Sequence, residues 1–212
     1  MAFTLDHFSI ARPYLFHLTA RDNLACIQEM RELLPTCSLL ERAKEGEWRG
    51  KKRPGHIPVQ LGRRVIWLRD QMPLHAGNMS LPPKWGFADL VELLNERVFF
   101  WPGRPNGLPI SYGDRHFERY RNDAPVILRI PTADALRANL NLAPEFSRFN
   151  SGSPRCSGGR PSPRGPRTFL SNADADFTVR TIVEVTFRGP FQLPPSTQRS
   201  DLPTGPWDPV WA

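Results

Sequence analysis

The segment that decides how the rest of the chain is interpreted is residues 13–24, PYLFHLTARDNL. Its aromatic and apolar opening, YLF, favours an extended backbone. Side chains alternate along a strand, so His17 and Thr19 are expected to point to the same face. Asp22 stands where it can cap a following helix. The segment therefore predicts a short strand that presents an imidazole and a hydroxyl on one side, with a helix directly after it.

Two helices are predicted next to this strand. Apolar residues recur at helical spacing over residues 23–34, and Pro35 ends the pattern. A second helix is predicted over 38–45, because Ser38 can cap its start and Gly46 can end it. Residues 47–62 are basic and rich in turn formers, which predicts a surface loop.

Strands then alternate with short helices. Strands are predicted at 65–68, 98–101, 126–130 and 181–187, and helices at 88–96, 116–121 and from a capping Thr132 to 140. The continuous apolar run VFFW at 98–101 is typical of a strand that is buried on both faces. The order lacks a regular strand-helix-strand alternation, so the predicted class is α+β. Neither a Rossmann-type glycine turn nor a P-loop is present.

Residues 150–167 consist almost entirely of Gly, Ser, Pro and Arg, a composition that cannot build a core. A core strand follows, so this segment is predicted to be a loop within a domain, which spans 1–190. We expect the loop at 150–168 to fold over a cleft, with ordered flanks and a disordered middle at 155–163. Arg160, Arg164 and Arg167 would then reach an anionic acceptor. Residues 191–212 are predicted to be a Pro-rich, partly disordered tail.

Composition narrows the partners and the compartment. The 212 residues carry a net charge of +7, mostly from arginine, which favours an anionic partner such as a nucleic acid or a dinucleotide. Three cysteines without metal-like spacing predict neither a disulfide framework nor a metal site. No signal peptide and no run of about 20 apolar residues is present. A cytoplasmic protein without membrane contact is the expectation.

Glu184 lies at the centre of the late strand, in TIVEVTF. Strict alternation would place Ile182 and Thr186 on its face. A carboxylate on an otherwise apolar strand needs a partner or a function. Glu184 is therefore either a site residue or an edge-strand glutamate that faces water. His17 likewise has two interpretations, a site residue or a buried histidine beside a capping threonine.

The opening pattern resembles that of ADP-ribosyltransferase folds, in particular DarT-type enzymes that modify DNA. The matching features are an aromatic residue, His17, a hydrophobe, Thr19, Asn23 followed by Leu24, and then an amphipathic helix. The later order of basic loop, VFFW strand and Val-Glu-Val strand is similar too, so the resemblance spans most of residues 13–190. It implies a split, mostly antiparallel sheet with flanking short helices, and NAD as a substrate.

The resemblance also implies roles for single residues. Glu184 would stabilise the oxocarbenium-like state in which the nicotinamide bond breaks, and Arg53 would meet the NAD phosphates, with Arg49, Arg63 and Arg64 as alternatives. The expected catalytic residues are thus Glu184 and Arg53. The expected NAD-binding residues are His17, Thr19, Asn23, Phe99, Phe100 and Ser151.

The chain is also similar to an uncharacterised bacterial family in three segments, 95–103, 149–152 and 164–169, which contain RVFFWPG, NSG and RGPxTF motifs. The segment with which DarT-type enzymes contact DNA is not recognisable. Two other functions therefore stay open. One is a catalytically inactive module that binds DNA or RNA, and the other is an enzyme similar to the RNA 2′-phosphotransferases of the same fold.

Overall fold

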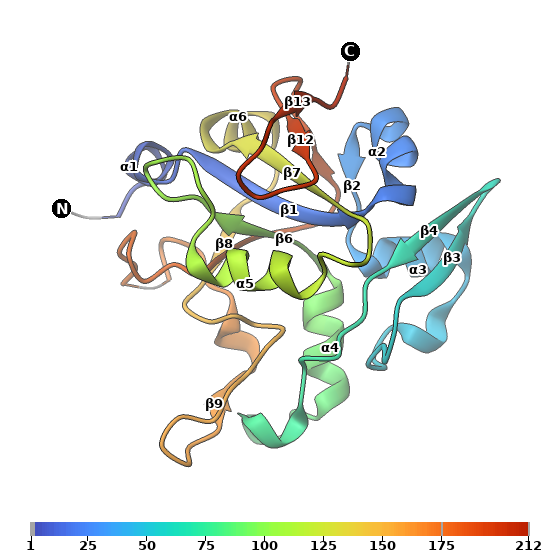
Figure 1. The fold of residues 1–212 in the computed structure, drawn as a ribbon. Coiled ribbons are helices and arrows are strands. Elements are labelled where there is room, and N and C mark those ends of the chain that lie inside the picture. Colours follow the sequence, from blue (N-terminus) through green and yellow to red (C-terminus); the bar gives the residue numbers. More distant parts are fainter. Residues whose placement is uncertain (1–2, 175, 212) are drawn as a thin grey trace.

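The computed structural model describes residues 3–174 and 176–211. Seven strands of this part of the chain form the main sheet, in the spatial order β13 (Asp208–Pro209), β12 (Gln198–Ser200), β7 (Pro125–Pro131), β1 (Tyr14–Ala20), β6 (Arg97–Pro102), β10 (Glu184–Arg188) and β8 (Pro144–Ser147) (Figure 1). All neighbouring strands in this sheet are antiparallel. The predicted α+β class with a mostly antiparallel sheet is confirmed.

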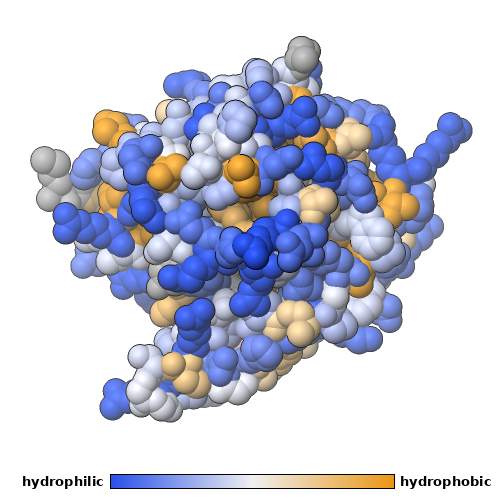
Figure 2. Space-filling view, in the orientation of Figure 1, coloured by the Kyte–Doolittle hydropathy of each residue, from blue (hydrophilic) through white to orange (hydrophobic). Residues whose placement is uncertain are grey.

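Short helices flank the sheet. They are α1 (Leu5–Ala11), α2 (Leu24–Met30), α3 (Thr36–Ala43), α4 (Phe87–Asn95), α5 (Ser111–Arg119) and α6 (Thr132–Ala138), with 3-10 turns η1 (Arg21–Asn23), η2 (Gly46–Trp48), η3 (Ala76–Asn78) and η4 (Pro166–Thr168). The hairpin of β3 (Ile57–Leu61) and β4 (Arg64–Leu68) projects from the body of the molecule (Figure 1). Two small pairs complete the fold, β2 (Glu32–Leu33) with β11 (Phe191–Gln192) and β5 (Met79–Ser80) with β9 (Ser162–Pro163). The face drawn in Figure 2 is mostly hydrophilic, with apolar residues in small separate areas.

The core lies on both faces of the sheet. On one face Leu15 and Phe100 pack with Phe187, and on the other Phe16 packs with Trp101 and with Phe117 of α5. Neighbouring residues of β1 and β6 thus join different clusters, as alternation along a strand requires. The predicted burial of the VFFW strand on both faces is confirmed.

The sheet is split between β1 and β6. β1 pairs with β7 at seven positions but with β6 at two, Leu15–Pro102 and Phe16–Trp101. Beyond Phe16 the two strands part, and the side chain of His17 reaches across to the carbonyl oxygen of Phe99, 2.9 Å from Nδ1. The split therefore places His17 where the middle of the sheet opens.

Several predicted elements begin or end elsewhere. The helix predicted over 23–34 ends at Met30, because Arg31 takes a left-handed conformation with φ of 55° and the chain then enters β2. Asp22 does not cap it, since the cap position is held by Asn23, without a side-chain capping bond. The loop predicted over 47–62 contains strand β3, which pairs along its whole length with β4. Thr132 is the first residue of α6 rather than its cap, and its hydroxyl donates to the carbonyl oxygen of Arg12.

The late strand also departs from prediction, because it begins only at Glu184. Strict alternation does not extend back to Ile182, which packs in the same cluster as Val185 and Phe187. The alternation error thus came from placing the start of the strand three residues too early. Strand β8, its neighbour, was not predicted at all.

The C-terminal segment 191–212 was wrongly expected to be partly disordered. It supplies β11 and the sheet strands β12 and β13, so the main sheet takes strands from both sides of residue 190. Val210 is 2% exposed in the core, and the indole nitrogen of Trp211 donates to the carbonyl oxygen of Gln28 at 2.9 Å. Apolar residues among the prolines thus anchor the segment.

Candidate functional site

A cavity lies where the sheet is split. Its volume is about 540 Å³, within the range of small-molecule sites. Seven of the eight residues predicted for the site line it, although they come from distant parts of the sequence: His17, Thr19, Asn23, Arg53, Phe99, Ser151 and Glu184.

Phe100 is the exception, and its expected contact with NAD is wrong. It is fully buried, and its ring lies 4.6 Å from that of Phe191 and 5.8 Å from that of Phe187. Phe99 and Phe100 are consecutive in a strand, so only one of them can face the cavity. Phe100 instead supports the His17 ring from the core side, with 5.7 Å between ring centres.

His17 is held as a neutral imidazole. Because a carbonyl oxygen only accepts hydrogen bonds, the bond from Nδ1 to Phe99 places the ring proton on Nδ1 and leaves a lone pair on Nε2. Burial, with a smaller effect of the nearby Arg69 charge, lowers the pKa of His17 to about 4, although the hydrogen bond to Phe99 acts in the opposite direction. At neutral pH the site therefore presents an uncharged, fixed hydrogen-bonding ring at this point.

Glu184 is the buried carboxyl group of the cavity. It is 3% exposed and begins β10, an interior strand between β6 and β8, so the interpretation as an edge-strand residue facing water is wrong. Its Oε2 accepts a hydrogen bond from the backbone amide of Ser151 at 3.1 Å. Burial raises the pKa of Glu184 to about 7, against the opposing effects of Ser151 and of the Arg164 charge. A carboxyl group poised near neutral pH in a cavity is a candidate catalytic group.

Ser151 offers a second polar group beside the carboxylate. The residue is 1% exposed, and its hydroxyl makes no well-formed hydrogen bond within the described residues, although it lies near enough to Glu184 to favour the ionised form. A buried hydroxyl without a partner needs one, because an unmade hydrogen bond is costly. Its place in the cavity lining lets a ligand supply that partner.

Arg164 fixes the loop that carries Ser151. Its guanidinium donates to the carbonyl oxygens of Asn150 at 2.8 Å and Pro163 at 2.8 Å and to the Ser162 hydroxyl at 2.6 Å, and it lies 4.6 Å from the ring centre of Phe149. The prediction that this arginine reaches toward an acceptor is therefore wrong, because its donors hold the loop itself.

The loop as a whole is docked rather than free. β9 pairs with β5, and the side-chain amide of Asn78 donates to the carbonyl oxygen of Pro154 at 3.2 Å. The middle, expected to be a disordered excursion, forms a turn closed by hydrogen bonds between Ser157 and Arg160. Residues 149–153 line the cavity, whereas Arg160 and Arg167 are not part of its lining. The first flank of the loop thus lies at the cleft as predicted, whereas of the second flank, 164–168, only Arg164 lines it.

Arg53 enters the cavity wall as a buried cation. It is 5% exposed, and its guanidinium donates to the carbonyl oxygen of Arg69 at 2.8 Å and to Oδ1 of Asn95 at 3.0 Å. Burial lowers its pKa to about 10, so it remains charged at neutral pH. Among the arginines considered for this role, Arg49, Arg63 and Arg64 do not line the cavity.

Thr19 and Asn23 line the cavity but also brace it. The Asn23 amide nitrogen donates to the Thr19 hydroxyl at 3.2 Å and to the carbonyl oxygen of Trp67 at 2.9 Å, and its amide oxygen accepts from the Trp67 backbone at 2.8 Å. These bonds tie β1 to the β3–β4 hairpin. The structure thus gives the pair a structural role at the edge of the site.

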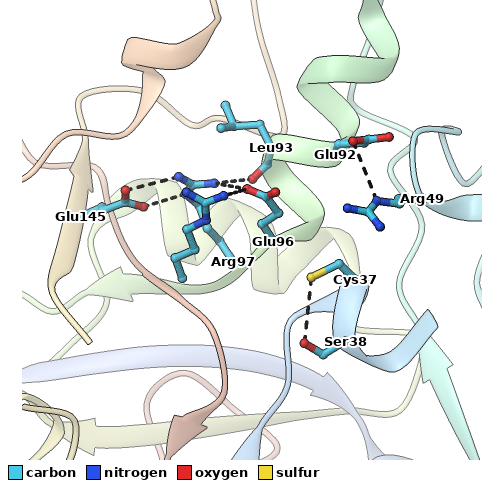
Figure 3. Close-up of polar contacts among 9 residues, drawn as sticks. Cys37, Ser38, Arg49, Glu92, Leu93, Glu96, Arg97 and Glu145 are labelled. Carbon is cyan, nitrogen blue, oxygen red and sulfur yellow. Dashed lines mark hydrogen bonds and ion pairs between the residues drawn. The ribbon is translucent and has the colours of Figure 1, made fainter. Parts of the chain in front are cut away.

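A buried ion pair lies beneath the same region (Figure 3). Arg97 of β6 holds both carboxylate oxygens of Glu145 of β8, with Nε to Oε2 at 2.7 Å and Nη2 to Oε1 at 3.3 Å, and it also donates to the carbonyl oxygen of Leu93 at 2.7 Å. The pair crosses β10, the strand of Glu184. It fixes the half of the sheet that carries the carboxylate.

The lining residues that were not recognised in the sequence include Arg69, His116, Arg119 and Tyr120. His116, Arg119 and Tyr120 belong to the segment RHFERY at 115–120, whose spacing puts them on one side of a helix. That spacing was the available signal. The helix predicted at 116–121 contained all three residues, but nothing in the sequence showed that this side of it faces the cavity.

Within the described residues, no group of three or more His, Cys, Asp or Glu side chains is arranged to hold a metal ion. Over the same residues, no helix has both the length and the apolar character needed to cross a bilayer. Cys26, Cys37 and Cys156 are free thiols.

Comparison with known proteins identifies the family. No curated protein and no solved structure matches the chain. One family model does match it, over residues 13–193, which run from the start of β1 to just beyond β11 and include every residue predicted for the site. The chain belongs to this family, DUF7002, a family of unknown function.

Proposed function

We propose that the protein is an NAD-dependent ADP-ribosyltransferase, which breaks the bond between nicotinamide and ribose and transfers ADP-ribose to an acceptor. The observation that carries the proposal is the meeting of His17 and Glu184 in one arginine-lined cavity at the split of the sheet. These residues stand near opposite ends of the chain, and they are the pair that the resemblance to ADP-ribosyltransferases singles out.

The residues of the cavity fit the demands of this reaction. Glycosidic cleavage of this kind develops positive charge on the ribose, and a nearby carboxylate stabilises that charge. Glu184 supplies the carboxylate, which accepts a hydrogen bond from the Ser151 amide at 3.1 Å and is only 3% exposed. Low local dielectric strengthens such an interaction. Glu184 would also accept a hydrogen bond from a ribose hydroxyl.

Other residues would bind and orient NAD. His17 offers a neutral ring whose Nε2 accepts a hydrogen bond, and Phe99 offers an aromatic surface beside it for the nicotinamide. The buried charge of Arg53 suits a phosphate. The unpartnered Ser151 hydroxyl provides a further polar contact near Glu184.

The test is nicotinamide release from NAD by the full chain, with and without added DNA or RNA. Wild type is expected to release nicotinamide, and Glu184→Gln to do so about a hundredfold more slowly, the size typical for loss of one oriented electrostatic group. Glu118→Gln is the matched control, because Glu118 is exposed on α5 and does not line the cavity. Equal rates for Glu184→Gln and wild type would overturn the proposal. No release by wild type under any condition would favour the inactive nucleic-acid-binding module.

The free cysteines fit a reducing compartment, so we place the protein in the cytoplasm within this proposal.

A further inference from the structure

A second cationic group lines the cavity on the side of α5. Its members from α5 and the residue after it are Arg115, His116, Arg119 and Tyr120, and Arg69 joins them from the segment after β4. The Arg69 guanidinium lies 3.8 Å from the centre of the Tyr120 ring, so the two elements meet at this stack. Hydrophilic side chains gather over α5 at the middle of the molecular face in Figure 2.

The guanidinium of Arg69 makes no hydrogen bond with the described part of the chain. Its Nε is buried, and no described residue accepts a hydrogen bond from it or forms an ion pair with the guanidinium. The adjacent carboxylate of Asp70 is engaged elsewhere. One of its oxygens accepts from the Tyr120 hydroxyl at 3.2 Å and the Met72 amide at 2.8 Å, and the other lies 3.2 Å from Nε2 of His56.

The other buried arginines of the cavity are committed to the fold. Arg53 donates to Arg69 and Asn95, Arg97 binds Glu145, and Arg164 holds its own loop. Arg69 differs from these three, because the carboxylates of Asp70 and Asp123 lie near it but no described residue accepts a hydrogen bond from its Nε. Burial, with smaller effects of Arg69, His17 and Arg119, lowers the pKa of His116 to about 3.

Two guanidiniums beside a neutral imidazole form a donor set that suits phosphate, which accepts several charge-assisted hydrogen bonds at once. The set is recessed, since Arg69 is partly buried and its Nε is fully enclosed. A recessed site admits a terminal group more easily than a phosphate linked on both sides. Both phosphates of NAD are linked on both sides, so NAD fits this subsite poorly.

We infer that Arg69, His116 and Arg119 form a subsite for the terminal phosphate monoester of a nucleic acid strand. Arg119 is the exposed member of the subsite, on the side where the next phosphate of a strand would lie, and the net charge of +7 favours such a polyanion. That this strand is the ADP-ribose acceptor rests on the proposed function. The binding of the phosphate does not.

The test compares the binding of a short oligonucleotide with and without a 5′-phosphate to the full chain, by calorimetric titration in the absence of NAD. The phosphorylated strand is expected to bind about tenfold more tightly, the contribution of a charge-assisted hydrogen-bond pair. Arg69→Gln and Arg119→Gln are each expected to remove this difference, and the second changes an exposed residue that the fold does not need. Arg167→Gln, also exposed but outside the cavity, removes the same charge and should keep the difference.

The outcomes separate this inference from the proposed function. Equal affinity for both strands, equal loss in Arg167→Gln, or tighter binding of a phosphoserine peptide than of the phosphorylated strand would each overturn it. Competition between NAD and the phosphorylated strand would also overturn it, because the subsite would then belong to the NAD site. If the phosphate preference holds but wild type releases no nicotinamide, the subsite stands and the proposed function fails.

Discussion

At the scale of single residues, the site depends on how Glu184 is held. Burial favours its neutral form, while the Ser151 amide and the Arg164 charge favour the carboxylate, and the balance leaves its pKa at about 7. Only the ionised form can stabilise positive charge on a ribose. Arg164 acts on Glu184 from within the loop, so we regard it as a positioning residue.

The balance predicts the pH dependence of activity. kcat/KM for nicotinamide release should be low at about pH 5.5 and rise through a pKa near that of Glu184, because the free enzyme must carry the carboxylate. Arg164→Met removes the charge that lowers this pKa and should move the rise to higher pH. Initial rates across the pH range provide the measurement. A rise that stays in place in Arg164→Met would show that Arg164 does not act on Glu184.

The raised pKa of Glu184 also predicts how the free energy of unfolding changes with pH. The pKa of Glu184 is higher in the folded than in the unfolded chain, so its contribution to stability is present below the unfolded value and is lost as pH rises through about 7. The free energy of unfolding of Glu184→Gln should therefore improve relative to wild type between about pH 5 and pH 8. Denaturant unfolding at both pH values measures this difference, and an unchanged difference would contradict the shifted pKa.

At the scale of elements, the strands β6, β10 and β8 act as one unit that carries Glu184. The Arg97–Glu145 pair crosses this unit, with the Arg97 side chain 4% exposed (Figure 3). Arg97→Met leaves the Glu145 carboxylate without its main partner. The Glu145 side chain is 23% exposed and can be partly hydrated, so the expected loss is on the order of 2 kcal/mol in the free energy of unfolding, between the values for exposed and for buried pairs.

Arg188→Met is the matched control for this change. Arg188 lies opposite Arg97 in the β6–β10 register, but its ion pair with Glu96 is exposed, so its loss should cost less than about 1 kcal/mol. Urea unfolding of both variants provides the comparison. Similar losses in the two variants would show that the pair across β10 does not hold this half of the sheet together.

The loop at residues 149–164 forms the second functional element, because its first residues line the cavity and its last arginine locks it. NAD bound beside Ser151 should reduce its opening and protect the exposed turn at Arg160. Trypsin does not cut the Arg160–Pro161 bond, so the bond to follow in this loop is the one after exposed Arg155. Cleavage there is expected to slow in the presence of NAD, whereas cleavage after exposed Arg63 at the hairpin tip should not change. Equal cleavage with and without NAD would show that the loop has no part in binding NAD.

At the scale of the whole molecule, much of the arrangement could be predicted from sequence, because local patterns carried it. The extended run before His17 and the apolar VFFW strand placed two central strands. The resemblance to ADP-ribosyltransferases then supplied the expected site residues, seven of which line one cavity. Phe100 was misplaced because a pattern of two aromatic residues does not tell which of them faces the ligand.

What the sequence did not reveal depends on contacts between distant segments. β8 and β12 are short and polar or proline-bearing, and they form strands because neighbours in the sheet complete their hydrogen bonds. Arg164 looked like a free cation, yet its partners are mostly backbone carbonyls, which no side-chain pattern records. The stack of Arg69 on Tyr120 joins residues 51 positions apart.

The central claim is that this cavity binds NAD with its nicotinamide ribose at Glu184. A crystal structure of Glu184→Gln with NAD tests it most directly, because the substitution keeps the shape of the site while slowing turnover. The account predicts the nicotinamide ribose beside residue 184 and the Ser151 hydroxyl, with the ring near His17 and Phe99 and a phosphate near Arg53. NAD bound outside this cavity, or with its nicotinamide end away from residue 184, would contradict it.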